Sequence, residues 1–133
     1  ASMGATAFQK ALGAMHALSH PVGSRYDKHH GMTNALFMPY VLQFNRGAIE
    51  DKIDRLAAYL GIKGGFVGFT DWVLKLREEL GVPHTLAAFG VGQEKFELMS
   101  KMSPKDPTAG GNPVPLDEAA SRKLFEAAHA GKM

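Results

Sequence analysis

The sequence predicts an all-α, multi-helix fold, and three observations support that class. Apolar residues recur every three to four positions, no stretch alternates apolar and polar residues as a half-buried strand does, and the breaks between periodic segments are short. These features indicate about five to seven packed helices without an internal domain boundary. At 133 residues, 45% of them hydrophobic, the chain is long enough to bury its own core as one domain, 1–133.

The first predicted helix covers residues 3–19. Phe8 and Leu12 begin an apolar stripe with helical spacing that continues to the end of the segment. A residue that precedes proline is disfavoured in helical geometry, so Pro21 predicts that this helix stops near His20.

Two further helices are predicted over residues 30–44 and 48–60. Pro39 should kink the first of them or remove one of its hydrogen bonds. The second has the clearest amphipathic pattern, and Gly61 is placed to cap its carboxyl end. Its predicted buried stripe consists of Ile49, Ile53, Leu56, Ala57 and Leu60.

The remaining chain predicts three more helices, at about 70–80 with an earlier start as the alternative, at 93–102 and at 117–129. Thr70 or Asp71 could cap the first of these. A loop rich in proline and glycine separates the last two. The final helix should bury Leu124, Phe125 and Ala128.

Composition excludes several classes of partner and site. The net charge of +2 and the lack of a basic stripe argue against nucleic acid, and no apolar run is long enough to predict a membrane span. Without cysteine, a metal would need imidazole or oxygen ligands. These features fit a cytoplasmic protein without a signal peptide. Because the chain opens on Ala1, we expect a piece of something longer or a trimmed product, with simple removal of an initiator methionine as the alternative.

The segment HALSHPVGSRYDKHHG, which starts at residue 16, holds four of the 6 histidines. His16 and His20 are one helical turn apart, so spacing alone suggests a chelating pair. His30 should lie at a helix amino terminus, where the dipole favours a neutral ring. Neutral imidazole binds zinc, iron, nickel or copper. The alternative is a chance cluster of solvated rings, with Asp27 as the segment's only carboxylate.

The histidines belong to a longer pattern with fixed spacing: Gly13 to Gly23, Tyr26-Asp27, His30-Gly31, Asn34-Ala35, Met38 to Val41 and Phe44-Asn45. This pattern resembles the signature of iron-containing (group III) alcohol dehydrogenases. Weaker similarity continues through LGVPHTLAAFGV and the Asn112-Pro113 loop, so the resemblance covers the whole chain. It is a resemblance only to the carboxy-terminal, all-helical half of such enzymes, without their α/β nucleotide-binding domain.

The resemblance implies different roles for the histidines. His16 and His30 match the family's ligands of a catalytic divalent metal, which would be Fe²⁺ with Zn²⁺ as the alternative. His20 matches the residue that faces nicotinamide and substrate and is implicated in proton transfer. The resemblance therefore implies that His16 and His20 do not chelate one ion together. The other two ligands, an aspartate and a histidine, and most of the NAD or NADP site would belong to the missing domain. His29 stands where the family often has proline, and it could be a spare ligand or a solvated neighbour of the site.

The implied function is the C-terminal part of a metal-dependent, NAD(P)-linked alcohol dehydrogenase, which oxidises an alcohol to an aldehyde or ketone by hydride transfer. The fragment alone should be inactive. A sister activity, such as a polyol or lactaldehyde reductase, is a near alternative. From another class, the alternative is a non-catalytic helical packing or assembly module that binds metal incidentally. Apolar residues on faces toward the missing domain, such as Met3, Phe8 and Met32, predict a homo-oligomer.

Overall fold

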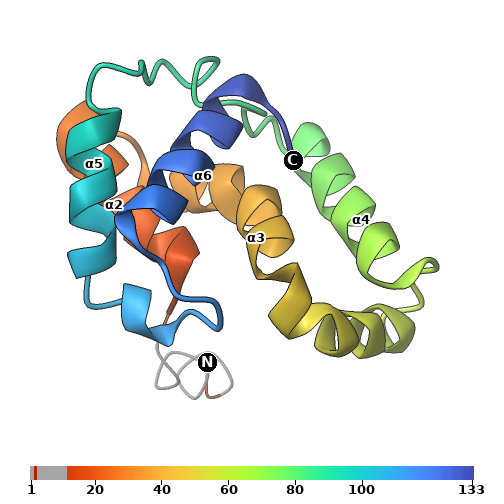
Figure 1. Cartoon of the computed structure of the whole chain (residues 1–133). Coiled ribbons are helices and arrows are strands. Elements are labelled where there is room, and N and C mark those ends of the chain that lie inside the picture. Colours follow the sequence, from red (N-terminus) through yellow and green to blue (C-terminus); the bar gives the residue numbers. More distant parts are fainter. Residues whose placement is uncertain (1, 3–11) are drawn as a thin grey trace.

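A computed structural model of the chain describes residue 2 and residues 12–133. Within that part the fold is all-α, as the sequence predicts (Figure 1). Its elements are α2 (Ala14–Tyr26), α3 (His30–Tyr59), α4 (Gly65–Glu79), α5 (Phe96–Met102), the 3-10 helices η1 (Ser103–Lys105) and η2 (Ala109–Gly111), and α6 (Glu118–Ala130).

The long helix α3 contacts three of the other helices. α2 and α6 pack against it, α4 runs back along it, and α5 pairs with α6 (Figure 1). None of the helices described here has the length and hydropathy of a membrane span. The helices therefore pack as one body around α3.

Three phenylalanines from three helices form the centre of the core. The rings of Phe37 in α3 and Phe96 in α5 lie 5.7 and 5.6 Å from the ring of Phe125 in α6, and all three are at most 1% exposed. Burying a side chain of this size stabilises the fold by about 1.5–3 kcal/mol. This contact fixes the α5–α6 pair against the first half of α3.

α2 continues through Pro21 to Tyr26, so the predicted stop near His20 is wrong. Proline has no N–H to donate to the carbonyl of Ala17, which removes one helical hydrogen bond. Pro21 is nevertheless buried against the core, and tertiary packing outweighs the local preference. The helix ends at Asp27, whose φ of 51° is in the left-handed region that aspartate tolerates better than most residues.

The helices predicted over 30–44 and 48–60 form one continuous helix, α3. A glycine inside a helix costs about 0.5–1 kcal/mol, but Gly47 does not end this one. Arg46 donates two hydrogen bonds, of 3.0 and 2.6 Å, to the carboxylate of Glu50 one turn later. This pair spans Gly47 and favours the helical backbone across it.

The predicted burial of the stripe on the second half of α3 is only partly correct. Ala57 is buried against Phe69 of α4, but Leu56 and Leu60 are 40% and 50% exposed. Tyr59 beside them is 88% exposed. We call these three exposed residues the Leu56 surface (Leu56, Tyr59 and Leu60).

α4 begins at Gly65, so the alternative of an earlier start is correct and neither Thr70 nor Asp71 caps the helix. The carboxylate of Asp54 in α3 accepts a hydrogen bond of 2.7 Å from the backbone N–H of Phe66, which satisfies one of the free donors of the first turn. The hydroxyl of Thr70 instead donates to the carbonyl of Phe66 at 2.9 Å. The cap therefore comes from another helix, which local sequence could not reveal.

The last two helices lie close to their predicted positions. α5 begins at Phe96, inside the predicted 93–102 segment. The carboxylate of Asp117 caps α6 by accepting a 2.7 Å hydrogen bond from the N–H of Ala120, and Gly131 ends the helix in a left-handed conformation. As predicted, this helix buries Leu124, Phe125 and Ala128.

A pair of asparagine amides ties the loop before α6 to the two helices that carry the histidines. The side chains of Asn45 in α3 and Asn112 exchange hydrogen bonds of 2.9 and 2.7 Å. Asn112 also accepts from the N–H of Ala14 at 3.1 Å and donates to the carbonyl of Val114 at 2.6 Å. This network fixes the start of α2 relative to α3.

Candidate metal and catalytic site

Three imidazoles from two helices meet where α2 and α3 lie side by side. His16 and His20 belong to α2, and His30 is the first residue of α3. The ring of His30 lies 5.2 Å from that of His16 and 5.1 Å from that of His20, and the His16 and His20 rings are 6.0 Å apart. The turn between the helices thus brings His30 back beside α2.

Two of these rings point their Nε2 atoms at the same side-chain nitrogen, Nδ2 of Asn34. The Nε2 atoms of His16 and His30 lie 3.3 and 3.0 Å from Nδ2 of Asn34. An amide nitrogen carries two protons and can donate one to each ring. In that arrangement both Nε2 atoms are unprotonated and present their lone pairs to a shared space. The amide oxygen of Asn34 is buried and has no hydrogen-bond partner among the described residues.

Ser19 favours the same tautomer of His30. Its hydroxyl donates to the carbonyl of His16 at 3.1 Å, and its oxygen lies 3.4 Å from Nδ1 of His30. Because the hydroxyl proton is already used, the oxygen accepts from Nδ1–H. The proton of a neutral His30 is then on Nδ1, which leaves Nε2 unprotonated, as the hydrogen bond from Asn34 requires.

The two rings fit half of a divalent-metal site. Burial lowers the pKa of His16, and the neighbouring His30 and His20 lower it further, against a smaller opposite effect of Asp106. A neutral imidazole with a free Nε2 is the form that binds iron or zinc. In residue 2 and residues 12–133, no group of three histidine, aspartate or glutamate side chains is arranged to hold an ion. A complete site would need further ligands from outside these residues.

His20 is held differently from the other two rings. Its Nδ1 lies 2.7 Å from Oδ2 of Asp106, and its ring stacks on that of His30 at an interplanar angle of 18°. Its side chain is 40% exposed. His20 therefore keeps an open face and does not share the Asn34 nitrogen with its neighbours.

Asp106 lies between η1 and η2 and is itself fixed. Its Oδ1 accepts hydrogen bonds of 2.9 Å from the N–H of Thr108 and 2.5 Å from the hydroxyl of the same residue. Burial raises the pKa of Asp106, but the hydrogen bonds from Thr108 and His20 outweigh this effect and bring the pKa below its ordinary value. The carboxylate is therefore ionised and has one oxygen left for His20.

Sequence reasoning gave no role to Asn34 or Asp106. Asn34 follows His30 by four residues, and this helical spacing was a usable signal. Asp106 is 86 residues from His20, and no local pattern connects the two. Asp27, the carboxylate that the histidine segment itself offered, is exposed and ends α2.

The remaining histidines lie apart from the three-ring cluster. Nδ1 of His29 accepts from the N–H of Met32 at 3.3 Å, so this ring caps the amino end of α3. His84 is exposed. His129 is half-buried, and its ring lies 5.6 Å from the ring of Phe96.

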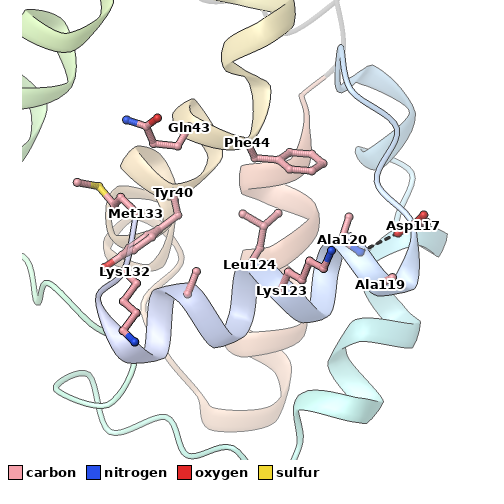
Figure 2. Close-up of a pocket in the computed structure, with 11 residues that line it drawn as sticks. Tyr40, Gln43, Phe44, Asp117, Ala119, Ala120, Lys123, Leu124, Lys132 and Met133 are labelled. Atoms are coloured by element: carbon pink, nitrogen blue, oxygen red, sulfur yellow. Dashed lines mark hydrogen bonds between the residues drawn. The ribbon is translucent and has the colours of Figure 1, made fainter.

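Two hollows border α3, and only one of them reaches the cluster. A hollow of about 350 Å³ includes His16 and has apolar walls from Met15, Met38 and Leu42. A second hollow, of about 500 Å³, lies between α3 and α6 and contains no histidine (Figure 2). Its lining includes Tyr40, Phe44, Leu124, Lys123 and Lys132. The first hollow is therefore the one that belongs with the histidines.

Comparison with known proteins shows the family to which the chain belongs. Residues 1–129 match the family described as "Fe-containing alcohol dehydrogenase family, C-terminal". The chain is 27% identical to NADPH-dependent butanol dehydrogenase of Clostridium saccharobutylicum, over 94% of this chain and 35% of that protein. It is 32% identical to maleylacetate reductase of Burkholderia cepacia, over 90% of this chain and 32% of that protein.

Solved structures show the same fold. The crystal structure of a 1,3-propanediol oxidoreductase superposes with a TM-score of 0.82 at 31% identity, over 88% of this chain and 32% of that one. The chain thus spans about a third of the length of the relatives it matches. From the family match, the shared fold and the histidine segment together, the chain belongs to the Fe-containing alcohol dehydrogenase family and corresponds to its C-terminal part.

Proposed function

We propose that this chain supplies half of the metal site and the proton-transfer group of an NAD(P)-linked alcohol dehydrogenase. The reaction is oxidation of an alcohol to an aldehyde or ketone by hydride transfer to the nicotinamide. One observation carries the proposal: two rings offer Nε2 to one space, while the third ring is held by a carboxylate. This division separates a metal-binding role from an acid–base role.

His16 and His30 are the residues that would hold a divalent ion, Fe²⁺ or alternatively Zn²⁺. Such an ion, when bound, supplies Lewis-acid polarisation of the substrate oxygen. Asn34 and Ser19 keep both Nε2 atoms unprotonated and ready for that role. The hydrogen bonds therefore prepare the two rings before any ion arrives.

His20 is the group proposed to move the hydroxyl proton. Its Nδ1 is occupied by Asp106, so Nε2 is the nitrogen that can accept or release a proton. Its side chain is 40% exposed, which leaves a route for the proton to solvent. The apolar side chains of Met15, Met38 and Leu42 line the open hollow that includes His16.

The cofactor and substrate are proposed only as classes. The name of the butanol dehydrogenase includes NADPH, which supports a nicotinamide cofactor bound mainly by a domain outside this chain. That relative and the maleylacetate reductase act on different substrates, so no single alcohol is favoured. We also propose a cytoplasmic location for the whole enzyme, as the composition predicts.

The test uses the longer protein that we propose contains this chain. Loaded with Fe²⁺ or Zn²⁺ under anaerobic conditions, it should reduce NAD or NADP in the presence of a primary or secondary alcohol. The 133-residue chain alone should show no turnover. Robust turnover by the isolated chain would contradict the proposed division between two domains.

The second candidate is a non-catalytic packing or assembly module. The Leu56 surface favours it, because three large exposed apolar residues at one end of the fold are typical of a contact surface. A longer protein that binds metal and nicotinamide but turns over none of a broad set of alcohols and aldehydes would support this candidate over the enzyme.

A further inference from the structure

The interaction between His20 and Asp106 fixes the position of the imidazole ring and also which of its nitrogens carries the proton. Oδ2 of Asp106 lies 2.7 Å from Nδ1 of His20 and, as an ionised carboxylate oxygen, can only accept. Nδ1 must therefore carry the proton. A neutral His20 then has its lone pair on Nε2, the atom needed for proton transfer.

The carboxylate cannot turn away, because its other oxygen is held as well. Thr108 donates to Oδ1 through both its N–H and its hydroxyl. The backbone N–H of Asp106 donates to the carbonyl of Ser103 at 3.2 Å, and its carbonyl accepts from the N–H of Ala109 at 3.0 Å. η1 and η2 thus hold Asp106, and both contact α2.

The same interaction keeps His20 out of the space between the other two rings. The centroid of His20 is 5.1 Å from that of His30 and 6.0 Å from that of His16. A ring at this distance that was free to rotate could turn a nitrogen toward their Nε2 atoms and become a third metal ligand. The hydrogen bond to Asp106 opposes that rotation.

We propose that Asp106 is the positioning residue of His20: it sets the Nδ1–H tautomer and keeps the ring available for proton transfer instead of metal binding. The inference rests on the proposed function for its catalytic consequence. The tautomer and the metal affinity can be measured without turnover. The proposal can therefore be tested even if the proposed reaction is wrong.

The decisive variant is Asp106→Asn, which keeps the shape of the side chain. Two donors from Thr108 hold the amide oxygen, so the NH₂ group faces Nδ1 of His20 and requires a lone pair there. The proton of His20 should then move to Nε2. NMR spectra of metal-free protein with isotope-labelled histidine, recorded where the ring is neutral, distinguish the two tautomers directly.

Kinetics supply the second measurement. In the full-length enzyme Asp106→Asn should lower kcat by about 10–100-fold with little change in KM, as expected when a partner that orients a functional histidine is altered. Asp106→Ala should lower kcat similarly and should also tighten Zn²⁺ binding, because His20 is released. Asp54→Asn, which alters a helix-capping carboxylate away from the site, is the matched control and should change neither quantity.

Retention of the Nδ1–H tautomer in Asp106→Asn would overturn the proposal, whatever the activity. A switched tautomer with unchanged kcat in an active enzyme would overturn its catalytic part. If the wild-type longer protein has no dehydrogenase activity, the proposed function fails. The tautomer and the Zn²⁺ affinity of the variants then decide this inference alone.

Discussion

Nδ2 of Asn34 lies 3.0 Å from Nε2 of His30, one helical turn earlier on α3. The same nitrogen lies 3.3 Å from Nε2 of His16. An uncharged amide therefore fills the space where the two proposed metal ligands converge.

Asn34→Asp should increase the affinity of this chain for Zn²⁺. A carboxylate between two Nε2 atoms would add a third ligand, and a histidine pair plus one carboxylate is a common metal-binding set. We expect at least about tenfold tighter binding, or about 1.4 kcal/mol, by calorimetric titration. Asn34→Leu has no ligand atom and serves as the control. Equal affinities in the two variants would contradict the convergence of His16 and His30.

The three clustered histidines should separate by role in the full-length enzyme. His16→Ala and His30→Ala should each lose bound metal. His20→Ala should retain metal and lose about 10²–10⁴-fold in kcat, the usual contribution of an acid–base group. Metal content per subunit, measured together with kcat, checks both expectations. Loss of metal only in His16→Ala and His20→Ala would instead support a chelate one turn apart on α2.

His29→Ala is the matched variant for this set. The residue is next to His30 in sequence, but its Nδ1 accepts from the N–H of Met32 and caps α3. Loss of a cap costs about 0.5–2 kcal/mol. We therefore expect a small decrease in the free energy of unfolding with metal content and kcat unchanged, measured by denaturant titration of the same preparations.

Arg77→Met should destabilise the fold although Arg77 forms no ion pair among the described residues. The side chain is 5% exposed, and its guanidinium donates to the carbonyls of Leu36, Pro83 and His84 at 3.1 to 3.2 Å. Removal of the guanidinium leaves these buried carbonyls without its hydrogen bonds, which should lower the free energy of unfolding by about 2–3 kcal/mol. Arg77→Lys should recover less than half of the lost stability, because an ammonium group cannot reproduce the planar set of donors of the guanidinium. Arg55→Met, at an exposed position, is the control in urea unfolding.

Stability should fall at alkaline pH through Tyr26. Burial first, and then the hydrogen bond of 2.7 Å to the carboxylate of Glu94, raise the pKa of Tyr26 to about 12. A raised folded-state pKa stabilises the fold below the ordinary value near 10, and that contribution is lost as pH rises from about 10 to about 12. Tyr26→Phe should flatten the dependence of unfolding free energy on pH in that window. Tyr59→Phe, at an 88% exposed position, should not.

The isolated chain should self-associate through the Leu56 surface. Met3 and Phe8, which the sequence analysis assigned to such a face, lie outside the described residues, and Met32 is half-buried. Leu60→Lys should shift the mass found by light scattering toward the monomer, because it places a charge among exposed apolar residues. Leu98→Lys, at a 45% exposed position on α5, should leave the mass unchanged.

The sequence predicted elements well where local patterns decide them. Asp117 and Gly131 mark the ends of α6 by ordinary capping chemistry, and the helix forms between them. The helix end predicted near His20 and the break predicted between residues 44 and 48 are both absent, since burial of Pro21 and the Arg46–Glu50 pair favour the helix. Propensity cannot weigh such contacts before the partners are known.

The candidate site, like the fold, could be predicted from the sequence only in part. His16, His20 and His30 could be selected from the sequence, since spacing and resemblance both point to them. Their separate surroundings could not be predicted. The contact between His20 and Asp106 joins positions 86 residues apart, and only the packing of η1 and η2 against α2 places them together.

The amide pair of Asn45 and Asn112 joins α3 to the loop that also carries Asp106, and this has a consequence for the order in which the site forms during synthesis. His16, His30 and Asn34 are close in sequence and leave the ribosome together, whereas Asn112 is 67 residues beyond Asn45 and Asp106 emerges just before it. A nascent chain can therefore present the two rings proposed as metal ligands while His20 is still unrestrained. On the proposed roles, an ion that binds before translation reaches the loop that holds Asp106 would meet three unrestrained imidazoles, so early loading of metal would select the wrong set of rings.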